Sequence, residues 1–349
     1  MSDPAPFPYS LRGYTPGDEE ALVQLFNRAY GKSVSQAYWR WKIKGYPSEV
    51  ENVWLAFDGP RAIFQYAGLP LRYHLGGQVR TGMVGADAMT DPDYRRNGLL
   101  TRGSQHAFEI WRHAGVAFNI GLPNERWGSR QEALGWKPLF ILQWMFYPLW
   151  PEAMLARKLK WPFLRKSRFF AKRWIARRVA TNPNLQLEAV TQADVTFDQL
   201  WTKIRDGFHF SVIRDRQWIQ WRYLDSPIFP YRVLTARAGN DLLGYAVYRV
   251  DEKTSLCFIA EIITARQDKA TWQALLRSVL GKMEMAGVET VLTQIPRPGW
   301  QYRQYQQNGF FPGRHGFQVR MVQLDPTLSF PALCDAEQWL MCGGDFDAI

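Results

Sequence analysis

The chain contains an internal repeat, and a repeat decides how a sequence is divided before any single motif is considered. The segment Trp41–Pro47 (WKIKGYP) matches Trp221–Pro227 (WRYLDSP) at an offset of 180 residues, and Asp58-Gly59 matches Ala238-Gly239 at the same offset. Further along, three pairs share an offset of 174: Ala86-Asp87 with Ala260-Glu261, Thr90 with Thr264, and Gly135-Trp136 with Gly309-Phe310. The 349 residues therefore contain two copies of one domain.

Both copies show the same order of predicted elements. A short strand and an amphipathic helix lead to a Trp-rich helix and a β-meander, followed by strand, helix, strand, helix and a closing hairpin. In the first copy the later elements are expected at residues 83–90, 99–114, 116–122, 126–134 and 139–147. The order predicts an α/β (mixed α+β) fold, each domain having a mixed, mostly antiparallel sheet flanked by helices and a βαβ unit. The predicted domains are residues 1–150 and 183–349, with a linker at 151–182.

Cysteine content and hydropathy bear on metal binding and on the compartment. Cys257, Cys334 and Cys342 are too few and too scattered for a disulfide framework, and no CxxC pair is present for zinc. No run of about 20 apolar residues occurs, and the first 14 residues lack an apolar leader segment. We therefore expect a cytoplasmic protein that holds no metal.

The net charge of +11 is concentrated in one segment. Residues 157–178 hold ten Lys and Arg and no acid, and the rest of the chain is nearly neutral. Aromatic side chains alternate with these cations, as in helices that lie on an anionic membrane. The other interpretation is an interdomain linker whose aromatics pack on the domains and whose cations face water. Nucleic acid is the least favoured partner, because the charge does not belong to the fold as a whole.

The segment Val84–Leu100 (VGADAMTDPDYRRNGLL) predicts a phosphate-binding loop. A buried strand ends at Thr90, Pro92 stops its hydrogen bonding, and a helix begins near Gly98. The first turn of a helix has free N–H groups and the positive end of the dipole, so a polyphosphate can bind there. Gly98 lets the backbone come close, and Arg95-Arg96 adds positive charge. The alternative is a solvated basic turn that only caps the helix.

This loop resembles the R-x-x-G-x-[GA] motif with which the GNAT acetyltransferase superfamily binds the pyrophosphate of acetyl-CoA. Arg95, Gly98 and the strand before them match, whereas Leu100 is larger than the usual final residue. The resemblance implies acetyl-CoA as co-substrate. The cofactor-binding residues that it implies here are Met89, Thr90, Arg95, Arg96, Asn97, Gly98, Leu99 and Leu100.

A second match follows the next predicted strand. GNAT domains often carry N-x6-Y-x3-G-F, and here Asn124, Gly135 and Trp136 stand at matching spacing, with Gln131 in the place of the tyrosine. The resemblance implies that Asn124 also binds the cofactor. An amide cannot act as a general acid, so the leaving thiolate would take its proton from water or another group. The tandem layout and the closing residues 339–347 also resemble two-domain GNAT proteins encoded in polysaccharide-type loci.

Acetyl transfer to an amine requires a base for the ammonium and an N–H for the developing oxyanion. In the GNAT scheme the strand that ends near Met89 and Thr90 offers this N–H. Asp87 lies two residues before Met89 and is the first candidate for the general base, acting directly or through water. Glu125 is the second candidate. The alternative for Asp87 is a carboxylate bonded to a neighbouring strand or to the arginine-rich loop.

The second copy departs from the loop pattern. Trp272 stands where the first copy has Gly98, and an indole there would fill the place of the pyrophosphate. Glu261 keeps the strand carboxylate, and Tyr305 stands four residues before Gly309, the usual place of the GNAT tyrosine. Either the second domain has lost its cofactor and shapes the acceptor site, with Tyr305 as a catalytic candidate, or both residues are relics that serve packing.

Three functions are consistent with this sequence. The first is an acyl-CoA-dependent N-acetyltransferase that acts on an amino sugar, a lipid-linked sugar or a small amine. The second is an aminoacyl transferase of the peptidoglycan-bridge type, which also has tandem GNAT-like domains but for which loss of the pyrophosphate loop is expected. The third is a catalytically silent acyl-CoA-binding protein or scaffold. The presence of Arg95 and Gly98 favours the first function over the second.

Overall fold

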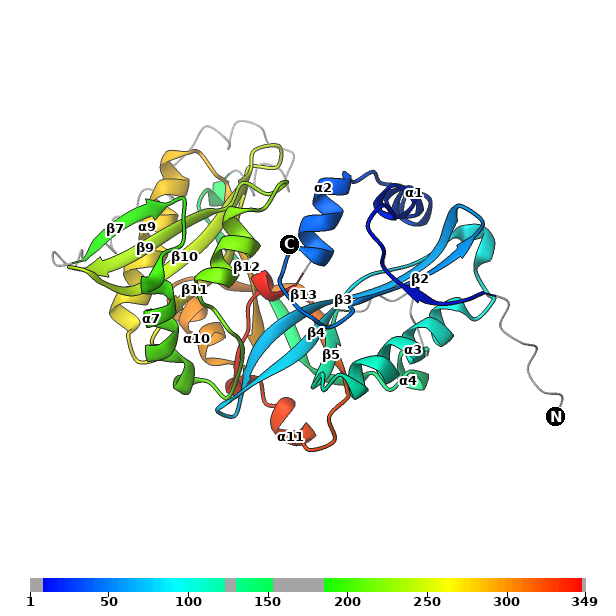
Figure 1. Cartoon of the computed structure of the whole chain (residues 1–349). Coiled ribbons are helices and arrows are strands. Elements are labelled where there is room, and N and C mark those ends of the chain that lie inside the picture. Colours follow the sequence, from blue (N-terminus) through cyan, green and yellow to red (C-terminus); the bar gives the residue numbers. More distant parts are fainter. Residues whose placement is uncertain (1–8, 123–129, 153–184, 347–349) are drawn as a thin grey trace. The chain divides into compact units, whose positions relative to one another are not determined.

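The computed structural model describes residues 9–122, 130–152 and 185–346 (Figure 1). The chain forms two compact units, each assembled from segments that are distant in the sequence. Unit 1 consists of residues 1–73, 78–139 and 318–334, and unit 2 of residues 74–77, 140–317 and 335–349. Among the helices of the described residues, none is long and apolar enough to cross a membrane.

Unit 1 is built on a sheet in which consecutive strands are neighbours. Its strands are β1 (Arg12–Gly13), β2 (Val53–Asp58), β3 (Arg61–Leu75), β4 (Gln78–Thr90) and β5 (Phe118–Gly121). β2 and β3 pair antiparallel, whereas β4 and β5 pair parallel. Its helices are α1 (Glu19–Tyr30), α2 (Gln36–Trp39), α3 (Leu99–His113), α4 (Arg130–Ala133) and α11 (Phe330–Leu333). Figure 1 shows α1 and α2 on one side of these strands and α3 and α4 on the other. The mixed, mostly antiparallel sheet flanked by helices confirms the predicted fold class.

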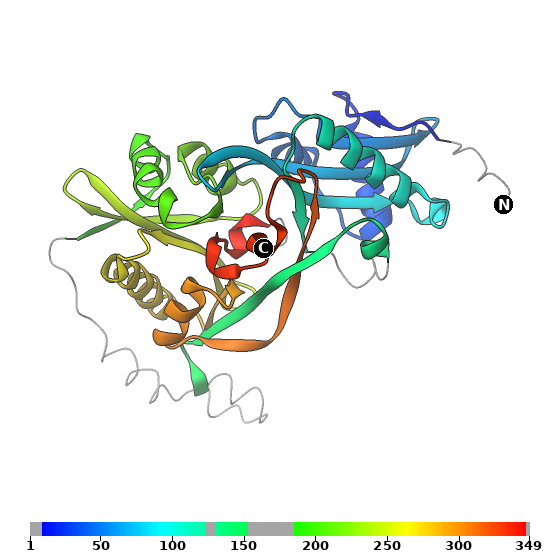
Figure 2. The ribbon, with the colours of Figure 1, turned by 90° about the horizontal axis from the view of Figure 1, so that it is seen from below.

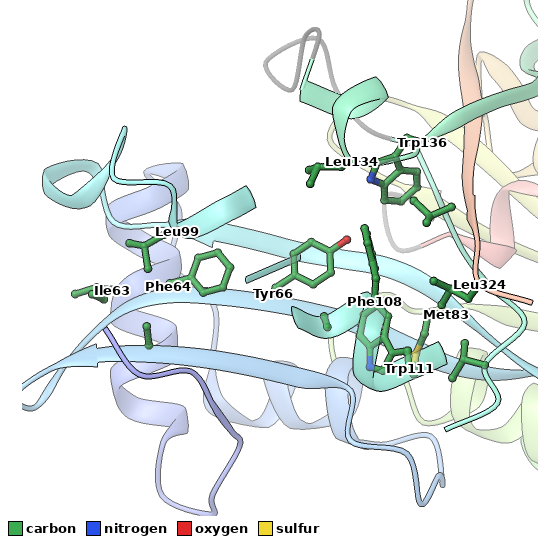
Figure 3. Packing of buried hydrophobic residues seen from close by; sticks show 14 residues of the cluster. Ile63, Phe64, Tyr66, Met83, Leu99, Phe108, Trp111, Leu134, Trp136 and Leu324 are labelled. Carbon is green, nitrogen blue, oxygen red and sulfur yellow. The ribbon is translucent and has the colours of Figure 1, made fainter. Parts of the chain in front are cut away.

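Helix α3 packs on this sheet because its apolar residues recur at helical spacing. Leu99, Phe108 and Trp111 are at most 5% exposed and belong to one core cluster with residues of β3 and β4 (Figure 3). Gly103 lets α3 approach the sheet closely, because a Cβ at this position would lie 2.2 Å from the ring of Phe64. The start of α3, and with it the predicted loop, is therefore fixed by packing.

Unit 2 repeats the same order of elements. Its strands are β7 (Gln186–Val190), β8 (Phe210–Val212), β9 (Arg232–Ala238), β10 (Asp241–Asp251), β11 (Leu256–Thr264), β12 (Thr290–Arg297) and β14 (Trp339–Leu340). Its helices are α7 (Val195–Ile204), α8 (Arg216–Ile219), α9 (Lys269–Met285) and α10 (Trp300–Gln307). β9, β10 and β11 pair antiparallel, and β11 and β12 pair parallel.

Equivalent elements fall at the offsets that the sequence repeat shows. α2 and α8 are displaced by 180 residues, and each continues into a turn of π-helix, Arg40–Lys44 and Gln220–Leu224. β4 and β11 both end at a threonine, Thr90 and Thr264, at the offset of 174. The same local sequence signals thus produce the same local structure twice.

The closing strand of each copy lies partly in the other unit. β6 (Lys137–Pro148), from the first copy, pairs antiparallel with β12 of unit 2. β13 (Phe311–Gln323), from the second copy, pairs antiparallel with β5 of unit 1 through residues 320–323. The compact units therefore combine segments of both copies, because the two copies exchange the ends of their last strands, and the domain division at residues 150 and 183 stays a prediction. The predicted linker lies mostly outside the described residues.

Candidate functional site

The predicted phosphate loop lies between the end of β4 and the start of α3. A single 3-10 turn, Pro92–Tyr94, leads into the exposed residues Arg95–Asn97 and then to Gly98, after which α3 begins. Arg96 and Gly98 both have left-handed backbone, with φ of 70° and 77°. A Cβ at Gly98 would meet nothing closer than 4.0 Å, so the glycine is required by the backbone conformation and not by crowding. An exposed loop with two arginines thus precedes the first turn of a 15-residue helix.

Asp91 anchors the loop to two other elements. Its carboxylate accepts hydrogen bonds from Nε of Arg28 in α1 (2.6 Å) and from Nη2 of Arg61 in β3 (2.8 Å), and its side chain is 0% exposed. Burial alone would raise the pKa of Asp91, but the hydrogen bonds from Arg28, the amide of Asp93 and Arg61 outweigh burial and lower this pKa. The loop therefore begins at a fixed, ionised carboxylate.

Strands β4 and β5 differ in length beside the loop. They pair in parallel at Met83↔Asn119 and Val84↔Ile120, and β5 then ends at Gly121, whereas β4 continues to Thr90. Gly85 and Gly121 face the ring of Trp136, which would lie 3.7 Å and 3.5 Å from a Cβ at these positions. Two residues without side chains thus lie at the point where β4 extends past its parallel neighbour.

Asp87 lies in this extension of β4 and forms an ion pair. Its backbone is left-handed, with φ of 41°, which is uncommon for a residue with a side chain. Its carboxylate accepts two hydrogen bonds from Nζ of Lys42, at 2.9 Å to Oδ1 and 2.8 Å to Oδ2. The side chains are only 7% (Lys42) and 12% (Asp87) exposed. Lys42 comes from the π-helical turn Arg40–Lys44, and such turns are frequent at functional sites.

The backbone of Asp87 is held as well as its side chain. Gln65 of β3 donates from Nε2 to the carbonyl oxygen of Asp87 (3.0 Å), and Trp39 of α2 donates from Nε1 to Oε1 of Gln65 (3.0 Å). Gln65 is 0% and Trp39 is 1% exposed. A buried amide bonded at both ends has one orientation. The irregular backbone just before Ala88 and Met89 is therefore a fixed part of the fold.

Unit 1 brings most of the predicted cofactor residues together, in different environments. Arg95, Arg96, Asn97 and Gly98 are exposed in the loop, and Thr90 is partly exposed at the end of β4. Met89 and Leu99 are 1% exposed, so they would offer a ligand their backbone and not their side chains. Leu100 packs against the core cluster of unit 1, which accommodates its size. Asn124 and Glu125 lie outside the described residues, and Gln131 is buried in α4.

The corresponding part of unit 2 is closed. The predicted match of Trp272 with Gly98 is wrong, because the connection after β11 is four residues shorter than the one after β4, so that Asp268 is the N-cap of α9 and Trp272 lies in the first turn of the helix. Trp272 is 0% exposed, and its ring lies 4.9 Å from that of Tyr305, which is itself 0% exposed. Glu261 accepts hydrogen bonds from Nε of Arg214 (3.0 Å) and from the hydroxyl of Tyr245 (2.9 Å). Burial raises the pKa of Glu261, against the effect of Arg214. The burial of Tyr305 and Glu261 supports the interpretation that they serve packing.

Several residues of the site carried no recognisable signal in the sequence. Lys42 is 45 positions from Asp87, and Arg28 is 63 positions from Asp91. Gln65 is one of several polar residues in β3. The repeat gave the one available signal for Lys42. Lys42 of the segment WKIKGYP aligns with Arg222 of the segment WRYLDSP, and both residues are cationic.

Comparison with known proteins agrees with this geometry. Residues 10–138 match the family model described as an acetyltransferase (GNAT) domain. These residues include the loop, the extension of β4 and the Lys42–Asp87 pair, so the predicted resemblance to GNAT acetyltransferases is confirmed. A comparison with curated proteins finds no match.

Solved structures of low sequence identity share the fold over most of the chain. A GCN5-related N-acetyltransferase from Anabaena variabilis is 13% identical, with a TM-score of 0.66 over 91% of this chain and 73% of its own. A conserved protein from Enterococcus faecalis, described as a probable N-acyltransferase, is 12% identical, with a TM-score of 0.67 over 90% and 73%. A GCN5-related N-acetyltransferase from Kribbella flavida is 13% identical, with a TM-score of 0.63 over 90% and 70%. The fold is thus that of the GNAT acetyltransferases.

Proposed function

We propose that this GNAT-fold protein is an acyl-CoA-dependent N-acetyltransferase whose unit 1 binds acetyl-CoA and transfers the acetyl group to an amine. The observation that carries the proposal is the loop at the start of α3. A left-handed residue at Arg96 and again at Gly98, two exposed arginines and a 15-residue helix give the fixed donors and the positive charge that a pyrophosphate requires.

We assign different parts of unit 1 to the pyrophosphate and to the pantetheine chain of such a ligand. The loop Arg95–Gly98 and the first turn of α3 would hold the pyrophosphate, with Asn124 as a further contact implied by the family motif. The part of β4 that passes the end of β5, through Met89 and Thr90, would hold the pantetheine chain by backbone hydrogen bonds. Gly85 and Gly121, which face the ring of Trp136, lie where the two strands diverge.

Acetyl-CoA would supply the thioester whose carbonyl carbon the amine attacks. The chain must then hold the amine, accept its proton and stabilise an oxyanion. We assign the proton to Asp87, directly or through water, with Glu125 as the second candidate. Lys42 and Gln65 fix the carboxylate and the backbone of Asp87, so that the base and the N–H groups after it keep one geometry.

The acceptor is proposed to be an amino sugar, a lipid-linked sugar or a small amine, in line with the resemblance to two-domain proteins of polysaccharide-type loci. We propose a cytoplasmic protein whose residues 157–178, which lie outside the described residues, contact anionic membrane. Salt-sensitive flotation with phosphatidylglycerol vesicles is expected, since each Lys or Arg near such a surface contributes about 1 kcal/mol. Recovery in the soluble fraction at low salt would assign this segment to a linker.

The experiment that tests the function is acetyl-CoA turnover over a panel of amino sugars, lipid-linked amino sugars and small amines, followed by thiol release. Turnover above the rate without protein, lost in Gly98→Trp, supports the proposal. Binding of CoA without turnover of any acceptor would favour the catalytically silent acyl-CoA-binding protein. The presence of Gln131 in place of the tyrosine is the sequence feature that supports this alternative. Absence of CoA binding would reject both and favour the aminoacyl transferase.

A further inference from the structure

Unit 2 contains an enclosed stretch of its own chain, residues Cys342–Phe346, here called the closing segment. Its residues are all buried, with Cys342 at 0%, Asp345 at 4% and Phe346 at 2% exposed. Figures 1 and 2 show this red segment beside the strands of unit 2 and the orange helix α10. Its sequence, Cys-Gly-Gly-Asp-Phe, is too short and too polar to be buried by hydrophobicity alone, so specific contacts must hold it.

The first of these contacts is between Asp345 and Arg214. Nη2 of Arg214 donates to both carboxylate oxygens of Asp345 at 2.8 Å, while Nε of the same guanidinium binds Glu261. The amide of Cys342 donates to Oδ2 of Asp345 at 2.7 Å, which closes a tight turn of the segment. The side chains of Arg214 and Asp345 are 0% and 3% exposed.

The second set of contacts holds the backbone. Arg222 donates from Nε to the carbonyl oxygen of Gly344 at 2.8 Å and from Nη2 to that of Phe346. Gly344 is enclosed so closely that a Cβ would lie 2.1 Å from the hydroxyl oxygen of Tyr223 and 3.5 Å from Cβ of Ala260. Unit 2 therefore holds the segment through the carboxylate of Asp345, through the carbonyl oxygens of Gly344 and Phe346, and through close contact at Gly344, which has no side chain.

On the proposed function, on which this step rests, the position of the closing segment corresponds to the side of β4 that we assign to acyl-CoA in unit 1. The parallel pairing of β11 with β12 runs from Leu256 to Ile259, although β11 continues to Thr264 and β12 to Arg297; at the equivalent place in unit 1, β4 extends past the end of β5. The closing segment contacts both β11 and β12. The segment lies directly against Ala260, and Arg214 links it to Glu261. Ala260 and Glu261 align with Ala86 and Asp87.

We propose that this part of unit 2 is a peptide-binding site whose ligand is the chain's own closing segment, which replaces an acyl ligand in the second copy. The charges support the assignment. Arg214 and Arg222 are both buried, and Glu261 and Asp345 together balance them. Without Asp345 the site would hold one uncompensated buried cation, which is strongly unfavourable.

The test is amide hydrogen exchange of the full-length protein, read on the peptide that contains residues 342–346. In the wild type these amides are expected to exchange at least about 100-fold more slowly than in an unstructured peptide, since exchange requires the segment to leave its site. Asp345→Asn and Gly344→Val are expected to raise the rate at least tenfold. The matched controls are Asp241→Asn, an exposed acid paired with Lys203, and Gly281→Val, where nothing lies within 4 Å of the added Cβ.

Amides of α9 in the same protein separate loss of the segment from loss of the fold. Faster exchange in residues 342–346 with unchanged exchange in α9 supports the site. Unprotected amides in the wild type, or variants as protected as the wild type, would overturn it. The same measurement with saturating CoA should leave the protection of the segment unchanged, and faster exchange of the segment on adding CoA would show that the two compete for one site, contrary to the proposal.

Discussion

Units 1 and 2 have the same elements in the same order, but the space beside the strand carboxylate is used in opposite ways. In unit 1 the loop before α3 is exposed, and Asp87 pairs with Lys42. In unit 2 the aligned carboxylate, Glu261, pairs with Arg214, α9 begins only five residues after the end of β11, and Trp272 is buried in the first turn of α9. The comparison teaches that the scaffold and the contents of its binding site change independently after a duplication.

One aligned position shows the change most clearly. Lys42 and Arg222 both project from a π-helical turn at the offset of 180. Lys42 binds the carboxylate of Asp87, whereas Arg222 binds backbone carbonyls of residues 344 and 346. A compact ammonium suits one carboxylate, and a forked guanidinium can donate to two carbonyls at once. The cation at this position of the fold thus binds a side chain in unit 1 and a peptide backbone in unit 2.

The largest effect is expected for Gly98→Trp, which places a bulky side chain in the exposed loop before α3. Tryptophan disfavours the left-handed backbone at this position, and its indole would fill the place assigned to the pyrophosphate. Calorimetry should show one CoA per chain for the wild type and no binding for the variant. Gly281→Trp on α9, where nothing lies within 4 Å, is the control and should bind normally. Two equivalent sites, or binding that survives Gly98→Trp, would show that the active unit is wrongly assigned.

Asp87→Asn is expected to lower kcat by about 10²–10⁴-fold while the affinity for acetyl-CoA stays nearly unchanged. The reason is that Asp87 lies on the strand to which we assign the acyl group and not in the loop Arg95–Gly98, to which we assign the pyrophosphate. Steady-state kinetics across the pH range is the measurement, with Asp93→Asn as the control, an exposed acid of the loop that pairs with Arg61. Turnover equal to the wild type at every pH would remove Asp87 from the mechanism and direct attention to Glu125.

Trp272→Ala tests whether unit 2 can regain a cofactor site when its filling side chain is removed. We expect a loss of about 3–5 kcal/mol in the free energy of unfolding of unit 2, as for other buried aromatic residues, and no second CoA. Urea-dependent amide exchange in α9 measures the first quantity and calorimetry the second. Met285→Ala in the same helix, at a side chain that is 83% exposed, should change stability little. A second CoA per chain in Trp272→Ala would mean that the tryptophan alone closes unit 2.

A fall in pH should lower the stability of unit 1 through the carboxylate of Glu19, which has no counterpart in unit 2. Burial would raise the pKa of Glu19, but hydrogen bonds from Tyr14, from backbone amides and from Arg40 outweigh it and lower the pKa to about 2. Because this pKa is below the ordinary value of 4.5, the contribution is complete above pH 4.5 and is lost as the pH falls towards 2. The equivalent helix of unit 2, α7, begins with Val195 at the position of Glu19.

The measurement for this prediction is amide exchange in α1 and in α7 between pH 5 and pH 3, corrected for the intrinsic rate. Opening of α1 should become easier with falling pH by more than that of α7. Glu19→Gln should remove this difference, because glutamine does not titrate. Equal acid sensitivity of the two helices in the wild type would contradict the assignment.

Local features of this molecule were predictable from the sequence, and distant pairings were not. The repeat, the order of elements and the loop from Arg95 to Gly98 follow from patterns within short windows. The Lys42–Asp87 pair and the burial of Asp345 against Arg214 depend on contacts between residues 45 and 131 positions apart. The strand exchange was invisible for another reason. β6 and β13 are copies of one another, so either sequence pattern fits either sheet.

The exchange of β6 and β13 also bears on how the protein is made. A ribosome delivers the first 122 residues early, yet the edge of β5 stays unpaired until residues 320–323 of β13 emerge. The half that is encoded first is therefore the half whose sheet is completed late in synthesis, and its exposed strand edge must avoid pairing with other nascent chains in the meantime. A gene cut at residue 150 would encode a unit 1 without its last strand, together with a strand that belongs to unit 2.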